Sequence, residues 1–188
     1  LVKFDFKHKL GEVLKCWAWS ISIDTAIDID EWKHAGFDLI ADHFDELPQE
    51  FIYYNNLASK ADINYFKSFN RIRTDILDNF ENIFDKYDYI ISPATVREPL
   101  DNNDNGWMYN IDGQKIQSNL GFINFAMTPL ANFVGYPSAA IPAGFTSNNL
   151  PIGMQVIGKQ YRDEDVLALA YTFEQIQPWR SEYGRIPQ

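Results

Sequence analysis

The stretch that decides the fold is Met127–Glu174, which reads MTPLANFVGYPSAAIPAGFTSNNLPIGMQVIGKQYRDEDVLALAYTFE. It contains two runs with strand composition, and residues 152–157 alternate with the two-residue period of a strand. Pro142 interrupts the first run, Ser138–Phe145, and removes a backbone donor, which predicts an edge strand or a bend. From Asp163 onward, apolar residues recur at helical spacing behind an acidic first turn, so we expect Asp163 to cap a helix. The stretch therefore predicts a strand hairpin followed by a helix.

The part of the chain that precedes this stretch is predicted to be mainly helical. Its predicted elements are helices over 8–23, 30–43, 48–54 and 62–83, a strand over 89–91 and a hairpin around Asp112–Gly113. The helix from Asp62 is the clearest, because its apolar stripe is opposed by charged residues on the other faces. Asp30 is the candidate N-cap of the second helix. With the hairpin described above, this pattern belongs to the α/β class.

Composition excludes several classes of partner. The 188 residues, 46% of them hydrophobic, suffice for a domain with a buried core. The net charge of −10 argues against nucleic acid or an anionic membrane surface as a partner, because phosphate binding needs clustered lysine and arginine. No apolar run approaches the 18 residues of a membrane span. The single cysteine, Cys16, fits a reducing compartment, and a cytoplasmic location is expected.

A search for catalytic groups finds no constellation that the residues themselves define. The three histidines, His8, His34 and His43, lack neighbours at metal-ligand spacing, so neither a metal nor a cofactor is expected. Ser138 has no candidate base near it in sequence and is interpreted as an ordinary strand serine. Cys16 lies inside an aromatic helical segment and is interpreted as a buried, inert thiol. The residue types alone therefore indicate an acidic α/β domain and no specific reaction.

The sequence motifs of the chain, taken in order along it, resemble those of the amidase signature family. The resemblance is strongest over 127–174 and weaker over 62–126, where Asp88–Pro93 looks like the family's D-x-x-x-S-P strand. Residues 1–61 form a helical region without a match. The resemblance implies that 1–188 is the C-terminal portion of a single amidase signature domain. The fold it implies is α/β, with a mixed β-sheet covered by helices.

The same resemblance implies an activity whose machinery lies elsewhere. Members of this family hydrolyse amides with a nucleophilic serine, a second serine on a cis peptide and a lysine. The Gly- and Ser-rich segment that carries the serines is not in this sequence, and neither is the lysine region, so no residue here is assigned a catalytic role. We expect this chain to be inactive by itself. Its expected partners are a small-molecule amide substrate and the N-terminal half of the same enzyme, and a homodimer remains an open alternative.

Two short motifs bear on the branch of the family. The run Thr128–Asn132 looks more like the aryl-amide and cyclic aminohexanoate-dimer hydrolases than the A subunits of tRNA-dependent amidotransferases. Those A subunits carry an acidic residue seven positions before the Asn, where this chain has Phe125. An aromatic ring cannot pair with an ammonium group as a carboxylate does, apart from weaker cation–π attraction. The alternatives that remain are a catalytically dead, amidase-derived binding module and the A subunit of a glutamine-dependent tRNA amidotransferase.

Candidate substrate-binding residues follow from the resemblance. The family's pocket wall places Phe125, Met127, Thr128 and Asn132 beside the acyl group of the substrate. Trp107 lies on a polar loop that is expected to cover the site. For each of these residues an ordinary role in the core or on the surface is the alternative interpretation.

Overall fold

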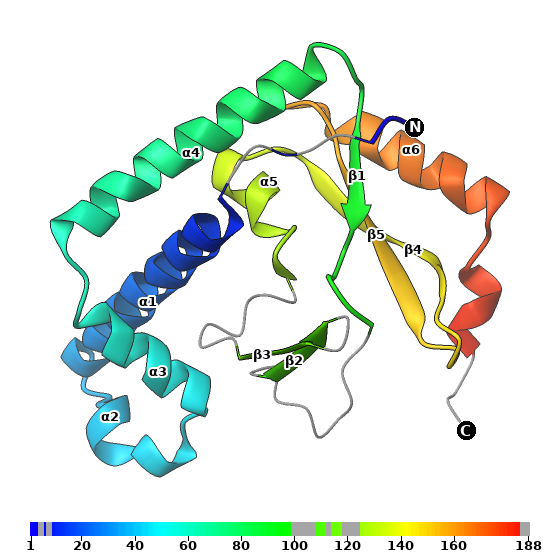
Figure 1. Ribbon diagram of the computed structural model, residues 1–188. Helices are drawn as coiled ribbons and strands as arrows, with labels where there is room; N and C mark the ends of the chain where they lie inside the picture. Colours follow the sequence, from blue (N-terminus) through cyan, green and yellow to red (C-terminus); the bar gives the residue numbers. More distant parts are fainter. Residues whose placement is uncertain (4–5, 7–8, 99–107, 112–113, 118–124, 185–188) are drawn as a thin grey trace. The chain divides into compact units, whose positions relative to one another are not determined.

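The computed structural model describes residues 1–3, 6, 9–98, 108–111, 114–117 and 125–184. The chain divides into two compact units, and the boundary between them falls inside the long helix α4 (Ile63–Phe84) (Figure 1). The helical unit comprises 8–75, and the sheet unit comprises 1–7 together with 76–188. Each unit has its own architecture.

The helical unit is built from two helices that pack side by side, two short connecting elements and the first part of a third helix. Its elements are α1 (Leu10–His34), α2 (Leu39–Asp42), the 3-10 turn η1 (Phe44–Glu46), α3 (Gln49–Ala58) and the first part of α4 (Ile63–Phe84). Helix α1 packs against α3. Trp19 of α1 stacks on Tyr65 of α4 with ring centroids 4.2 Å apart, and this aromatic contact joins the start of α4 to α1.

The N-terminal helices correct one prediction. Helix α1 runs without a break from Leu10 to His34, so the predicted boundary between 8–23 and 30–43, with Asp30 as an N-cap, is wrong. The residues between the two predicted helices contain no proline or glycine, and nothing in them ends a helix. The N-cap of the next helix, α2, is Asp38, whose side chain accepts a hydrogen bond from the Ala41 N–H at 3.0 Å.

The sheet unit contains a three-stranded sheet in the order β1-β5-β4, with all described pairs antiparallel. Its further strands form the antiparallel pair β2–β3. Its elements are β1 (Ile90–Pro93), β2 (Met108–Ile111), β3 (Gln114–Gln117), α5 (Pro129–Val134), β4 (Ser138–Phe145), β5 (Pro151–Ile157), α6 (Asp163–Ile176) and the 3-10 turn η3 (Arg180–Gly184). Strands β2 and β3 flank the predicted hairpin turn at Asp112–Gly113, which lies outside the described residues. The predicted α/β class is confirmed.

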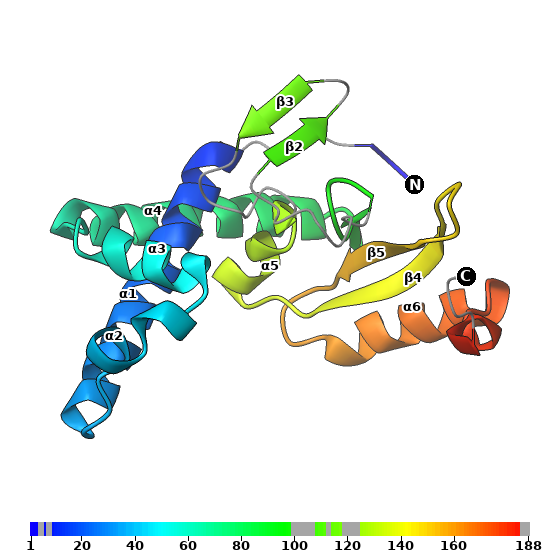
Figure 2. The same ribbon diagram turned by 90° about the horizontal axis from the view of Figure 1, so that it is seen from below.

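One face of the three-stranded sheet is covered by α6 (Figure 2). Ile141 of β4, Val156 of β5 and Val166 of α6 form the buried centre of this layer. The sheet register shifts between Pro142 and Gly144, and β4 lies at an edge of the three strands. The edge position and irregularity predicted from Pro142 are therefore confirmed.

The start of α6 differs from the prediction by one residue. Arg162 occupies the N-cap position without a side-chain cap bond, and Asp163 is already the first helical residue. The Arg162 guanidinium instead donates to both carboxylate oxygens of Asp165, at 2.8 and 2.9 Å. This bidentate pair lowers the pKa of Asp165 and keeps an acid near the positive end of the helix dipole.

Packing of α6 on the sheet predicts a sharp penalty at Gly158. A Cβ added there would lie 2.5 Å from Cγ2 of the buried Val166, and the Gly158 N–H already donates to the Pro137 carbonyl at 3.0 Å. Gly158→Ala should therefore destabilise the sheet unit by about 1–3 kcal/mol, measured by urea unfolding of the protein that carries this chain.

Gly11→Ala is the matched control, because nothing lies within 4 Å of a Cβ at Gly11 in α1. There the change should be neutral or stabilising, by at most about 1 kcal/mol. Equal unfolding midpoints for the two variants would contradict the tight approach of α6 to the sheet.

Candidate functional site

The candidate substrate-binding segment is the turn 125–128 together with α5. Both the N–H and the side-chain hydroxyl of Thr128 donate to the Phe125 carbonyl, at 3.0 and 2.9 Å. Pro129 then starts the helix at a position where a missing backbone N–H costs nothing. Gly135 ends it in the left-handed conformation, with φ of 71°, and its N–H donates to the Ala131 carbonyl at 2.9 Å. Local hydrogen bonds thus fix both ends of the segment.

The structure brings four of the five predicted site residues onto this segment. Phe125 is 49% exposed, Asn132 is exposed, and Met127 and Thr128 are half-buried. Asn132 lies in α5, and Phe125, Met127 and Thr128 lie in the turn that precedes the helix. Trp107 lies outside the described residues, so its predicted role stays a prediction.

The opposite side of α5 is buried, which fixes the orientation of the exposed residues. Leu130, Ala131, Phe133 and Val134 are all buried. Just after the helix, Tyr136 stacks on Phe84 with centroids 5.4 Å apart, and it meets Phe80 edge-to-face at 5.1 Å. Phe80 and Phe84 belong to the part of α4 within the sheet unit. This aromatic cluster holds α5 at the end of α4.

Tyr136 also carries a polar anchor for α5. Its hydroxyl donates to the Glu81 carboxylate in a short hydrogen bond. Burial of the phenol, followed by the hydrogen bond and the negative charge of Glu81, raises the pKa of Tyr136 well above its usual range. The hydroxyl therefore stays protonated and acts as a structural donor.

The exposed side chains of this segment are suited to binding. Phe125 offers an exposed ring for an apolar group, and Asn132 offers an exposed carboxamide that can both donate and accept. The Thr128 hydroxyl is already used to donate to a backbone carbonyl. A hydroxyl nucleophile needs an adjacent base, and neither Phe125, Met127 nor Asn132 is one. The exposed ring and carboxamide of the segment are groups that can contact a bound molecule.

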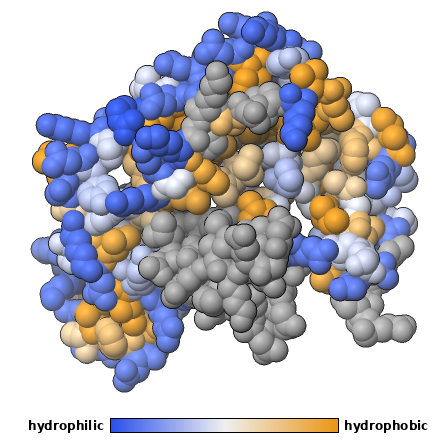
Figure 3. All heavy atoms as spheres, in the orientation of Figure 1, coloured by the Kyte–Doolittle hydropathy of each residue, from blue (hydrophilic) through white to orange (hydrophobic). Residues whose placement is uncertain are grey.

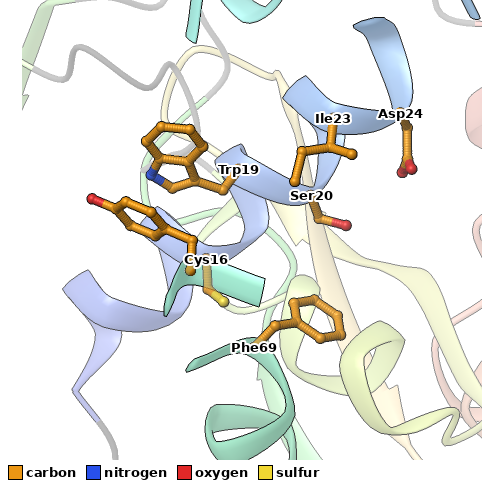
Figure 4. Close-up of a pocket in the computed structure, with 7 residues that line it drawn as sticks. Cys16, Trp19, Ser20, Ile23, Asp24 and Phe69 are labelled. Carbon is orange, nitrogen blue, oxygen red and sulfur yellow. The ribbon is translucent and has the colours of Figure 1, made fainter. Parts of the chain in front are cut away.

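A second candidate is a small apolar groove in the helical unit, between α1 and α4 (Figure 4). The described residues that line it are Cys16, Trp19, Ser20, Ile23, Asp24, Tyr65 and Phe69. Burial raises the pKa of the Cys16 thiol, which disfavours the nucleophilic thiolate. None of these lining residues is a histidine or lysine that could serve as a base. The groove is therefore a hydrophobic depression, and Cys16 is buried as predicted.

Over the described ranges, no three His, Cys, Asp or Glu side chains group in a way that could hold a metal ion. Within the same residues, no helix combines the length and the apolar character needed to cross a membrane.

The family of the chain follows from its sequence. The amidase family model matches residues 14–167, and the chain belongs to the amidase family. The predicted membership is confirmed. The match also includes most of 1–61, the region for which the sequence motifs gave no resemblance.

Curated relatives are components of amidotransferases. The A subunit of the glutamyl-tRNA(Gln) amidotransferase of Thermodesulfovibrio yellowstonii is 35% identical over 116 residues, which are 61% of this chain and 22% of that protein. The corresponding protein of Bacillus cytotoxicus is 34% identical over 112 residues, 59% of this chain and 21% of that protein. The chain thus spans about a fifth of the length of these relatives.

Two solved structures share this fold. A bacterial aryl acylamidase of the amidase signature family superposes with a TM-score of 0.83 at 28% identity, over 98% of this chain and 38% of that chain. A 6-aminohexanoate cyclic dimer hydrolase complexed with substrate gives a TM-score of 0.74 at 20% identity, over 100% of this chain and 39% of that one. The fold is therefore a part of the amidase signature fold, as predicted.

The anchor at Tyr136 predicts a pH-dependent loss of stability on the alkaline side. The raised pKa means that the stability contributed by the neutral phenol is fully present below about pH 10, the unfolded pKa. It is lost as the pH rises further, because the unfolded tyrosine then releases its proton and the folded one keeps it. Tyr136→Phe should cost about 1 kcal/mol near neutral pH and should flatten the alkaline decline.

Urea unfolding between pH 8 and pH 11 measures both effects. Tyr171→Phe removes the same hydroxyl from an exposed ring on α6 and serves as the control. If the unfolding free energies of wild type and Tyr136→Phe decline in parallel above pH 10, the anchoring role is contradicted.

Proposed function

We propose that 1–188 is the C-terminal part of a single amidase signature domain in an enzyme that hydrolyses amide bonds. The observation that carries the proposal is the joint agreement of sequence and fold: a family match over 14–167 and a TM-score of 0.83 to an aryl acylamidase. The reaction uses a nucleophilic serine, a second serine on a cis peptide and a lysine, all from the N-terminal half of the enzyme. A serine needs such a base to attack, and backbone donors to hold the oxyanion. This chain by itself is inactive.

The proposed substrate is a small amide whose acyl side is apolar or uncharged. The exposed ring of Phe125 supports this, since an ammonium group is better held by a carboxylate at that position. Asn132 supplies an amide that can bind a polar group beside the ring. Met127 and Thr128 complete the wall, and Trp107 keeps its proposed place on a covering loop.

The proposed partner of the chain is the N-terminal half of the same cytoplasmic enzyme. Exposed apolar side chains in both units support this. Hydrophobic residues gather on the visible surface over α2 and α3 (Figure 3), and Phe37 and Phe44 beside these helices are 52% and 49% exposed. On α6, Leu167 and Ile176 are 67% and 77% exposed. Surfaces of this kind mark interfaces. A homodimer is the competing explanation.

The A subunit of a glutamine-dependent tRNA amidotransferase is the second candidate. It is favoured by 35% identity over 116 residues to such a protein. Phe125 disfavours it, because an aromatic ring cannot pair with an ammonium group as a carboxylate does. A catalytically dead binding module is a third reading, from a different class of protein.

Mutation of Phe125 tests the proposed wall. In the full-length enzyme, Phe125→Ala should raise KM for an aryl amide about tenfold and leave kcat nearly unchanged, because an apolar contact made in both ground and transition state is lost. Phe125→Asp should weaken binding further, since its carboxylate must be desolvated beside the apolar group. Steady-state hydrolysis followed by release of the arylamine measures both.

Tyr171→Ala is the matched control, because it removes an exposed ring from α6, outside the proposed wall. Both alanine variants should fold with similar cooperativity. If Phe125→Ala and Tyr171→Ala have the same KM as wild type, Phe125 is not part of the wall.

The two enzyme candidates differ in their substrate. The full-length protein should release arylamine from a neutral aryl amide and should release little ammonia from glutamine, and 1–188 expressed by itself should do neither. Glutamine hydrolysis with no aryl-amide hydrolysis would favour the amidotransferase. Loss of both activities in a correctly folded full-length protein would favour the binding module.

A further inference from the structure

The helical unit carries an acidic groove between α1 and the connection from α3 to α4, distinct from the depression beside Cys16. The α1 residues that line it are Ile23, Ala26, Ile27, Asp30 and Glu31. They recur every three or four positions, so they share one face of the helix. Along this face, apolar turns are followed by an acidic turn. The α1 side of the groove is therefore apolar at one end and negatively charged at the other.

The apolar part of the acidic groove is open to solvent. Ile27 of α1 is 51% exposed, and Ile63, which lines the groove from the start of α4, is 64% exposed. Exposed aliphatic side chains that stand singly are ordinary on a protein surface, but these two line the same depression. Apolar surface that is gathered in one place and rimmed by charged residues marks a site of protein interaction.

The acidic groove lies in a strongly negative part of the chain. Between Asp24 and Asp62, ten residues are acidic and two are basic, Lys33 and Lys60, so this segment carries most of the net charge of −10. The Lys33 ammonium pairs with the Asp38 carboxylate at 2.8 Å. A negative potential over this surface attracts cations and repels anionic membranes, nucleic acids and a second copy of the same face. Charge complementarity therefore selects a basic occupant.

The acidic turn also bears on where that occupant comes from. Asp30 and Glu31 are both exposed. If the remainder of the amidase domain covered them, their carboxylates would have to leave water, which is unfavourable unless each charge is paired. A helix face of this composition is suited to the outer surface of a complete enzyme. This argues for an occupant that is a separate protein.

We propose that the acidic groove docks a basic amphipathic helix of a separate protein. Aliphatic side chains of that helix pack on Ile27 and Ile63, and its lysine or arginine side chains pair with Asp30 and Glu31. Ile23 to Glu31 span about 12 Å along α1, which matches about two turns of a docked helix. The groove belongs to the helical unit and the candidate substrate-binding segment to the sheet unit, so the inference does not depend on the proposed reaction.

Binding of a designed peptide to the full-length protein tests the inference. The probe is a fluorescent peptide of about 14 residues with leucine on one helical face and lysine on the others. Its control carries glutamate in place of lysine. Fluorescence anisotropy should show saturable binding of the lysine peptide, weakened by added salt, and no binding of the glutamate peptide. Equal binding of the two peptides, or no saturable binding of the lysine peptide, would overturn the inference.

Two variants of the full-length protein locate the bound peptide. Glu31→Lys reverses a charge in the acidic turn, and Ile27→Gln removes an apolar contact, so each should weaken binding at least about fivefold. Both positions are exposed on a helix, so the melting temperature should stay that of wild type. The matched controls are Asp78→Lys, at an exposed position of α4 outside the groove, and Ile27→Leu, which keeps the apolar contact. Both controls should bind within about twofold of wild type. If Asp78→Lys weakens binding as much as Glu31→Lys, the attraction is not specific to the groove and the inference fails.

Discussion

Val156 and Ile157 point to opposite faces of β5, and both are buried, so the middle strand is covered on its two sides. The rest of the sheet unit depends on this burial. Val156 joins Ile141 and Val166 in the layer beneath α6, and the close approach of α6 leaves no room for a side chain at Gly158. A strand buried on both faces has no solvent-facing side, and the polarity of each residue on it has to be matched by a neighbour.

The candidate wall is held in place by packing more than by polar contacts. The buried side of α5 and the aromatic cluster of Tyr136, Phe80 and Phe84 fix the helix, and one hydrogen bond to Glu81 orients the tyrosine. Interiors packed in this way have low compressibility and hold a surface steady. Asn132 is thereby left on the exposed side of α5, and Phe125 is exposed in the turn before it.

The proposed function divides the chemistry between this chain and the polypeptide that would complete the domain. Hydrolysis of an amide needs a nucleophile, a base and oxyanion donors within a few ångströms of one another. In the proposed function, the candidate wall supplies an apolar ring and an exposed carboxamide that would select and orient a substrate.

The sequence by itself determined the local elements: the strand hairpin, the helix behind it, the edge position of β4 from Pro142, and the family. These follow from periodicity and proline chemistry, which act over a few residues. It misplaced helix boundaries at Asp30 and Asp163, because acidic residues cap a helix or lie within it with similar ease. Only the tertiary structure decided that Gln155, polar in an alternating strand, is buried. Whether an alternating position meets water depends on what covers the second face of the sheet, and distant parts of the chain decide that.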